Sequence, residues 1–166
     1  MEAIESEVKK LIDSGFVREE QHPKWLANIV PVLKKNGKIR ICIDFRDINT
    51  ACPKDDFPLP ITDVIIDNTC RFERMYFMDG FSDYNQIKMH PDDEKNTVFR
   101  TPLGIFCYTV MPFGLKNAGA TYQRAMSKIF QEHLRKTVEC YVDDLVVKSR
   151  DKNDHIKDLK IMFDLM

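Results

Sequence analysis

The sequence Cys-Tyr-Val-Asp-Asp-Leu-Val-Val at residues 140–147 places two adjacent carboxylates inside an otherwise apolar run. An apolar run of this kind is typical of a buried strand, and an unpaired charge in a dry core costs far more than the neighbouring valines return. We therefore interpret residues 137–148 as two strands joined by a tight turn at Asp143 and Asp144, since Asp tolerates turn geometry. On its own, the pair is either a simple hairpin turn or part of a ligand site.

A third acid, Asp79, ends another apolar stretch, Met-Tyr-Phe-Met-Asp-Gly at 75–80. Two buried strands would then deliver three carboxylates to one edge of a sheet. Like charges packed together raise one another's pKa unless a cation lies between them, and carboxylate oxygens suit Mg²⁺ or Mn²⁺ rather than zinc. The pattern favours a site for two divalent ions roughly 3.5 to 4 Å apart, as in polymerases and nucleases.

Length and composition predict a globular protein with a real core, because the chain has 166 residues of which 43% are apolar. The net charge of -1 argues neither for nor against a nucleic-acid partner. The five cysteines include no Cys-x-x-Cys pair, which favours a reducing, intracellular compartment. The acidic N-terminus and the lack of long apolar runs predict neither a signal peptide nor a membrane span.

Periodicity and turn signals predict an α+β fold of two lobes. The Asn36-Gly37 pair favours a hairpin with a basic tip, and three prolines at 52–60 favour an extended connector between the lobes. The expected helices are 2–14, ended by Gly15, then 61–67, 117–135 with Asn117 as N-cap, and 154–165. On the third helix, Ala118, Tyr122, Met126, Ile129 and Phe130 share one face. The expected strands are the hairpin within 25–45, then 72–79, two strands around 97–110, and 137–148.

Six blocks of the chain, in order, resemble the reverse transcriptase domain of gypsy-type long-terminal-repeat retrotransposon polyproteins, of the kind common in plants. The blocks are Trp-Leu-Ala-Asn-Ile-Val-Pro-Val-Leu-Lys-Lys (25–35), Arg-Ile-Cys-Ile-Asp-Phe-Arg-Asp-Ile-Asn (40–49), Phe-Pro-Leu-Pro (57–60), Phe-Met-Asp-Gly-Phe-Ser-Asp-Tyr-Asn-Gln-Ile (77–87), Val-Met-Pro-Phe-Gly-Leu-Lys-Asn-Ala-Gly-Ala-Thr-Tyr-Gln-Arg (110–124) and Tyr-Val-Asp-Asp (141–144). A lone Tyr-x-Asp-Asp would be weak evidence, whereas six ordered blocks are specific.

The resemblance implies a right-hand polymerase with fingers at roughly 1–56 and a palm at roughly 57–166, with some fingers strands near 90–112. It implies an antiparallel palm sheet packed on helices, without the thumb. It further implies an enzyme that copies an RNA or DNA template from a primer, using deoxynucleoside triphosphates and two Mg²⁺ or Mn²⁺ ions. Its parent polyprotein, Pol, would carry thumb, connection and ribonuclease H regions, and the family works in cytoplasmic virus-like particles.

By resemblance, Asp79, Asp143 and Asp144 occupy the catalytic, metal-binding positions, with Asp79 and Asp143 as the more direct ligands. The backbone of Gly80 adjoins the same site. Tyr141 and Val142 would lie against the primer terminus.

The nucleotide site is likewise given by resemblance. Arg40 and a lysine, Lys35 or Lys34, would close on the triphosphate, whereas without the resemblance a solvated hairpin is the favoured explanation of these cations. Tyr84 would lie under the incoming sugar and reject a 2′-hydroxyl, or it is an ordinary core tyrosine. Phe113 and Gly114 would pack beside the nucleotide, with Gly allowing close backbone approach.

Asp44 and Arg46 match positions near the templating strand, and they could equally form an ion pair with each other. Asp83 departs from the family pattern, which has Gly there, so an added carboxylate would repel a triphosphate. The chain also stops one helix after Tyr-Val-Asp-Asp, without the thumb whose phosphate contacts support template binding.

Two other functions therefore stay open from the sequence. The first is a noncatalytic retrotransposon remnant that acts as a structural or nucleic-acid-binding module, which Asp83 and the missing thumb favour. The second is a palm-like site for another phosphotransfer, such as nucleotide cyclisation, although such an enzyme would need neither the hairpin nor the Pro-Phe-Gly-Leu block.

Overall fold

The computed structural model describes residues 2–35, 37, 39–79 and 83–166. The chain forms two compact units, one made of Met1–Lys54 and Tyr84–Ala118 and the other of Asp55–Asp83 and Gly119–Met166. Each unit contains one sheet, and helices pack against both sheets. The predicted α+β class is thus confirmed.

The first unit contains the five-stranded sheet, with strand order β1-β6-β5-β2-β3. Its elements are α1 (Glu2–Asp13), β1 (Val17–Glu19), β2 (Ala27–Leu33), β3 (Ile39–Ile43), α2 (Arg46–Ala51), α4 (Pro91–Glu94), β5 (Phe99–Thr101) and β6 (Gly104–Tyr108). A short 3₁₀ turn, η1 (Asp83–Gln86), begins at the division between the units. The core of this unit is built from Val8, Val17, Phe45, Phe99, Phe106, Tyr108 and Val110.

Two local predictions for the first unit are confirmed. Gly15 ends α1 with a φ of 69°, and its N–H donates to the carbonyl oxygen of Ile12 at 2.9 Å. β2 and β3 form the expected antiparallel hairpin, with Leu33 opposite Ile39. Gly37 lies in its turn with a φ of 79°, whereas Asn36 lies outside the described residues.

The proline-rich connector forms no helix or strand at 53–60, as predicted. Asp55, which the division assigns to the second unit, accepts two hydrogen bonds from Arg124 Nη2, at 2.9 and 2.6 Å. The same guanidinium lies over the ring of Phe57, with its Cζ 4.7 Å from the ring centroid. The hydrogen bond from Arg124 holds the pKa of Asp55 below its usual value. The start of the connector is therefore tied to α5 (Ala118–Ile129).

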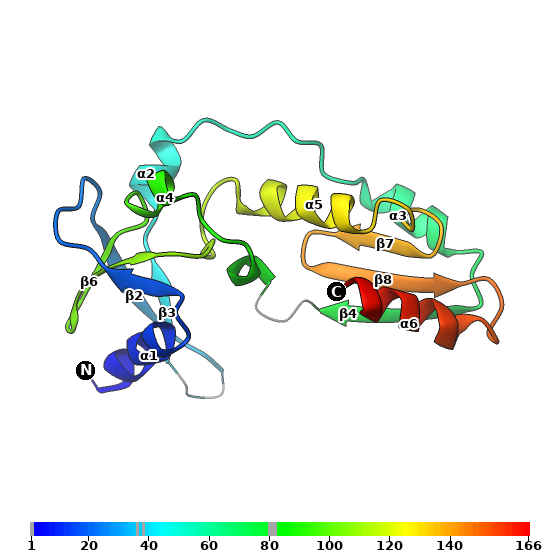
Figure 1. The fold of residues 1–166 in the computed structure, drawn as a ribbon, viewed down its shortest axis with the longest axis horizontal. Coiled ribbons are helices and arrows are strands. Elements are labelled where there is room, and N and C mark those ends of the chain that lie inside the picture. The colour runs from blue at the N-terminus through cyan, green and yellow to red at the C-terminus, as the bar shows by residue number, and fades with distance from the viewer. Residues whose placement is uncertain (1, 36, 38, 80–82) are drawn as a thin grey trace. The chain divides into compact units, whose positions relative to one another are not determined.

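The second unit contains an antiparallel three-stranded sheet, ordered β4-β8-β7. Its strands are β4 (Arg74–Asp79), β7 (Val138–Tyr141) and β8 (Asp144–Ser149), and its helices are α3 (Thr62–Thr69), α5 and α6 (His155–Leu165). Figure 1 shows the three strands side by side, with α6 running along β8. Residues of α5 and α6 pack on one face of the sheet, in a core of Phe130, Val138, Cys140, Leu145, Val147 and Met162.

The opposite face of this sheet carries a buried ion pair. Lys148 is 0% exposed, and its Nζ lies 2.6 Å from Glu139 Oε1. The same Nζ donates to the carbonyl oxygen of Asn68 at 2.8 Å and lies 4.5 Å from the ring centroid of Phe72. Lys148 therefore joins β8 to β7 and to the last turn of α3.

One helix is shorter than predicted. α5 ends at Ile129 rather than near Arg135, and the chain turns so that β7 can start at Val138. The turn closes through Arg135, which has a φ of 64° and whose N–H donates to the carbonyl oxygen of Val138 at 2.9 Å. The apolar spacing misled the prediction because Phe130 belongs to the core without being helical. Ile129, expected on the buried face, is 46% exposed.

Candidate active site

Two of the three predicted acids face each other across adjacent strands. Asp79 is the last residue of β4 and Asp144 is the first residue of β8, and the strand register makes them direct partners. Tyr141 of β7 is the partner of Asp144 on its other side. Cross-strand partners share a face of the sheet, and directly opposed like charges are destabilising unless something neutralises them.

The third acid, Asp143, lies in the turn between β7 and β8. The expectation of a turn at Asp143 and Asp144 was wrong by one residue, because Tyr141 pairs with Asp144 and leaves Val142 and Asp143 as the turn. Val142 has a φ of 50°, a left-handed conformation in which a β-branched side chain is strained. The turn that carries Asp143 is thus held in a costly conformation.

One oxygen of Asp143 is buried without a partner. Asp143 Oδ1 is inaccessible to solvent and has no hydrogen-bond partner among the described residues. A carboxylate oxygen removed from water normally needs a donor or a cation to offset its desolvation. This orphaned oxygen, next to Asp144 and its cross-strand partner Asp79, fits a site for a divalent cation.

The acids do not form a ready-made cage. Within the part of the chain that the structure describes, no three His, Cys, Asp or Glu side chains already stand at metal-ligand positions. Mg²⁺ typically takes one or two protein carboxylates and completes its shell with water and substrate phosphates. Gly80, whose backbone is expected beside the ions, lies outside the described residues.

A buried glutamine that sequence reasoning did not single out holds the turn. Gln123 of α5 is 1% exposed. Its Oε1 accepts from the N–H of Val142 at 2.7 Å, and its Nε2 donates to the carbonyl oxygen of Cys140 at 3.2 Å. The available signal was its position three residues before Met126 and seven before Phe130, on the apolar side of the helix.

The thiol beneath this turn reports the local charge. Burial raises the pKa of Cys140 to about 12, and the negative charges of Asp143 and Asp144 act in the same direction. Cys140 is therefore a neutral, unreactive thiol. Its surroundings are apolar, and the nearby carboxylates give them a negative electrostatic potential. A cation bound at the acids would relieve that negative field.

Replacing Gln123 by Leu is expected to destabilise the chain by about 1 to 3 kcal/mol, because the N–H of Val142 and the carbonyl of Cys140 lose their partner. Thermal unfolding would measure the loss. Gln131→Leu makes the same chemical change at an exposed position and should leave the midpoint nearly unchanged. Equal midpoints for the two variants would show that Gln123 does not hold the turn.

Three of the predicted nucleotide residues, Arg40, Tyr84 and Phe113, meet in the first unit. Tyr84 and Phe113 stack edge to face with ring centroids 4.7 Å apart, and the Cζ of Arg40 lies 5.7 Å from the Phe113 centroid. Tyr84 is 9% exposed, whereas Phe113 is 43% exposed. Gly114 follows with a φ of 96°, and a Cβ there would lie 3.5 Å from a ring carbon of Phe45. A side chain at position 114 would therefore be strained by the backbone rather than by lack of space.

The remaining predicted residues are placed as follows. Lys34 and Lys35 are exposed at the end of the β2 strand. Asp83 opens η1, and its side chain lies outside the described part of the molecule. Arg46 Nη2 lies 2.6 Å from Asp44 Oδ2, which realises the ion pair left open by the sequence. The hydrogen bond from Arg46 lowers the pKa of Asp44.

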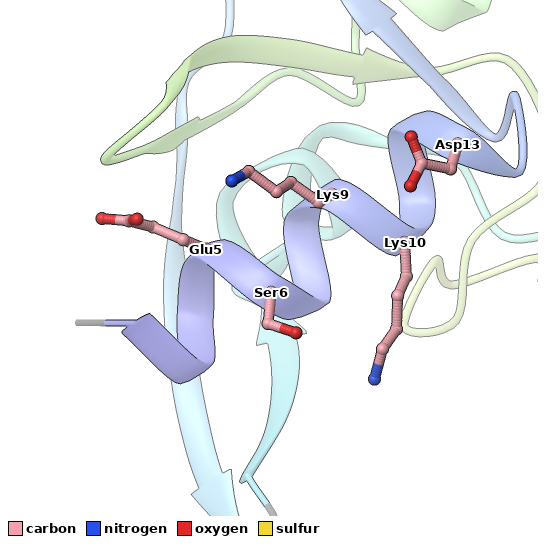
Figure 2. Close-up of a pocket in the computed structure, with 5 residues that line it drawn as sticks. All are labelled: Glu5, Ser6, Lys9, Lys10 and Asp13. Atoms are coloured by element: carbon pink, nitrogen blue, oxygen red, sulfur yellow. The ribbon is translucent and has the colours of Figure 1, made fainter.

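A hollow on the outer face of α1 carries charged side chains of both signs. A hollow of about 440 Å³ on α1 is lined by Glu5, Ser6, Lys9, Lys10 and Asp13. Figure 2 shows Lys9 and Lys10 pointing in different directions, and Lys10 is paired with Glu7. This hollow is the solvated outer surface of one helix. Within the described ranges, no helix combines the length and apolar character needed to cross a membrane.

Known proteins match the chain in sequence. A family described as "Reverse transcriptase (RNA-dependent DNA polymerase)" matches residues 32–166. The retrovirus-related Pol polyprotein from transposon 297 of Drosophila melanogaster is 30% identical over 164 residues, which are 96% of this chain and 16% of that polyprotein. The transposon Tf2-3 polyprotein of Schizosaccharomyces pombe is 30% identical over 163 residues, 96% of this chain and 12% of its own length.

Solved structures match the fold. The native prototype foamy virus protease-reverse transcriptase superposes with a TM-score of 0.87 at 21% identity, over 98% of this chain and 22% of that one. The foamy viral enzyme in complex with an RNA/DNA hybrid gives the same TM-score at 20% identity, over 99% of this chain and 22% of its own.

The chain thus spans less than a fifth of the curated polyproteins it matches. The predicted resemblance to the reverse transcriptase domains of long-terminal-repeat retrotransposon polyproteins is confirmed. Because the family match covers residues 32–166 of 166, this chain belongs to the reverse transcriptase (RNA-dependent DNA polymerase) family.

Proposed function

We propose that this chain is the catalytic segment of a gypsy-type reverse transcriptase, which extends a primer with deoxynucleotides along an RNA or DNA template. The observation that carries the proposal is the orphaned Oδ1 of Asp143, buried beside Asp144, which itself opposes Asp79 across the sheet. Three acids at one sheet end are costly in a purely structural protein, and they are useful where cations and a triphosphate neutralise them.

The residues of the second unit would hold two Mg²⁺ or Mn²⁺ ions, with Asp79 and Asp143 as the direct ligands and Asp144 beside them. Such ions, when bound, supply a lowered pKa for the primer 3′-hydroxyl and neutralise the leaving pyrophosphate. Tyr141 and Val142 would lie against the primer terminus. In this role the strained turn at Val142, fixed by Gln123, keeps Asp143 in place before substrate arrives.

The residues of the first unit would bind the incoming deoxynucleoside triphosphate. Arg40 and Lys35 are cations on the β2–β3 hairpin and suit the phosphates. Phe113 and Gly114 would line the nucleotide, and Tyr84 would lie under its sugar. Asp44 and Arg46, already paired with each other, would contact the templating strand. Asp83 is a candidate repulsive neighbour of the triphosphate.

We further propose that the unit with the β2–β3 hairpin is the fingers and the unit with the Asp79 strand is the palm. The template and primer would be RNA or DNA, and the structurally similar foamy viral enzyme forms a complex with an RNA/DNA hybrid. The thumb, connection and ribonuclease H partners would come from the rest of a Pol polyprotein.

The proposal is tested by thermal unfolding of the purified chain with and without Mn²⁺ plus a deoxynucleoside triphosphate, followed by primer extension on RNA and DNA templates. A ligand that binds only the folded state raises the midpoint, by an amount set by its concentration relative to Kd. A chain that unfolds cooperatively without any shift would instead be a noncatalytic remnant.

Replacing Tyr84 by Val is expected to raise the incorporation of ribonucleotides relative to deoxynucleotides by about tenfold, because a steric barrier to the 2′-hydroxyl is removed. The ratio of kcat/KM for the two sugars measures the change. Tyr76→Val removes an exposed tyrosine of β4 and should leave the ratio unchanged. Unchanged discrimination in Tyr84→Val would leave Tyr84 as an ordinary core residue.

A further inference from the structure

The loop that carries Phe113 and Gly114 is bonded to α2 by one side chain, Asn49. Asn49 Nδ2 donates to the carbonyl oxygen of Gly114 at 2.7 Å, and Asn49 Oδ1 accepts from the backbone N–H of Lys116 at 2.8 Å. A primary amide offers a donor and an acceptor in one plane, so a single group satisfies two backbone atoms of the loop. Asn49 is half-buried, and both of its bonds to the loop lie at the surface of the first unit.

Three further bonds connect the same segments, and one of them runs from Asn117 Nδ2 to Cys52 Sγ at 3.4 Å. Lys116 Nζ donates to the carbonyl oxygen of Cys52 at 2.8 Å, and Asn117 Nδ2 donates to that of Pro53 at 2.9 Å. These donors belong to the loop itself and reach the chain just after α2. Asn49 is the contact made from within α2, whose backbone is fixed by the bond from its own N–H to the carbonyl oxygen of Phe45 at 2.8 Å.

The loop needs such an anchor for a conformational reason. Gly114 has a φ of 96°, and glycine loses more freedom on ordering than any other residue. Phe113, just before it, is half-exposed, and among the described residues its ring contacts Tyr84 edge to face and lies under the guanidinium of Arg40. Without the two bonds from Asn49, the peptide after Phe113 would sample other conformations and move the ring with it.

We propose that Asn49 is a positioning residue for nucleotide binding: it fixes residues 113–116 in the conformation that presents Phe113 and Gly114 to the incoming triphosphate. The inference rests on the nucleotide role proposed for that loop. α2 begins at Arg46, so the same short helix connects the loop to the Asp44–Arg46 pair. A base seated at that pair and a nucleotide seated at the loop would thereby share one rigid support.

Amide hydrogen exchange by NMR tests the anchor directly, without requiring activity. In Asn49→Ala the exchange of the Lys116 amide should accelerate by about tenfold, the effect of losing a hydrogen bond of ordinary strength, while β5 and β6 keep their protection. Thr50→Ala is the matched control, because it removes a side-chain bond to the carbonyl oxygen of Arg46 in the same helix and touches no loop atom. Equal Lys116 exchange in Asn49→Ala and the parent would overturn the proposal.

Asn49→Asp separates the two bonds and serves if Asn49→Ala does not fold. Its carboxylate still accepts from the Lys116 N–H, but it repels the Gly114 carbonyl oxygen, so the Lys116 amide should stay protected while the loop loses its other bond. In primer extension by either Asn49 variant, we expect KM for the deoxynucleotide to rise by about tenfold with little change in kcat, because nucleotide binding rather than the chemical step is disturbed.

The outcomes are distinguishable. A loosened loop with unchanged KM would overturn the positioning role and leave Asn49 as a structural contact. A parent chain that binds no deoxynucleotide would instead overturn the proposed function itself, and with it the role of the loop, whatever the exchange data show.

Discussion

Asp143→Asn is expected to abolish primer extension and the stabilisation of the chain by Mn²⁺ plus a deoxynucleoside triphosphate. The substitution keeps the shape of the side chain but removes the charge from the oxygen that is buried without a partner. Metal ligation supplies several kcal/mol of transition-state stabilisation, so the rate should fall by about 10³-fold or more. Single-nucleotide extension under excess triphosphate measures it.

The stability of Asp143→Asn without ligand provides an independent test of charge repulsion at the site. Because like charges at the site repel one another, neutralising Asp143 should leave the unfolding midpoint equal to or above that of the parent without Mn²⁺. Asp164→Asn, an exposed acid of α6, is the matched control and should change neither extension nor midpoint. Normal extension by Asp143→Asn would remove the metal assignment.

Lys148→Met is expected to cause the largest loss of stability, about 3 to 5 kcal/mol, because it leaves the carboxylate of Glu139 buried without its cation. Lys148 is 0% exposed and lies 2.6 Å from Glu139, so water cannot replace the lost ammonium without opening the sheet. The substitution Lys148→Met also removes the donor to the carbonyl oxygen of Asn68 in α3. Urea unfolding at neutral pH measures the change.

A second variant identifies the cause. Lys148→Met combined with Glu139→Leu should recover much of the stability, since replacing a whole buried pair by apolar residues is often nearly neutral. Lys160→Met makes the same change at an exposed lysine of α6 and should cost little. If Lys148→Met costs no more than Lys160→Met, the pair contributes nothing to the sheet that carries the acids.

Sequence patterns predicted most strands and helices because burial imposes a period that can be counted. The helix before Gly15 was found in this way, whereas the β2–β3 hairpin was found from its β-rich runs and the Asn36-Gly37 pair, and β4 from its apolar run ending at Asp79. The pattern failed where one core residue continued the helical spacing beyond the helix, at Phe130. It also missed the short helices α2 and α4, which contain no buried residues to count.

The sequence alone identified the family and predicted a cation site at the acids. Ordered blocks identify the reverse transcriptase family, and carboxylates at the ends of apolar strands indicate a cation site, because both signals lie within short stretches of chain. Which acid lies in the turn was decided by register, since Tyr141 pairs with Asp144 and excludes Asp143 from the strand.

Only the tertiary structure determined the supports of the site. The bonds of Gln123 to the Asp143 turn, of Asn49 to the Gly114 loop and of Lys148 to Glu139 join positions on different elements. The sequence does not predict these bonds, because the direction of a polar side chain is set by the residues that it packs against. That direction leaves no period in the sequence. The sequence located the candidate metal-binding acids, and packing decided what holds their turn in place.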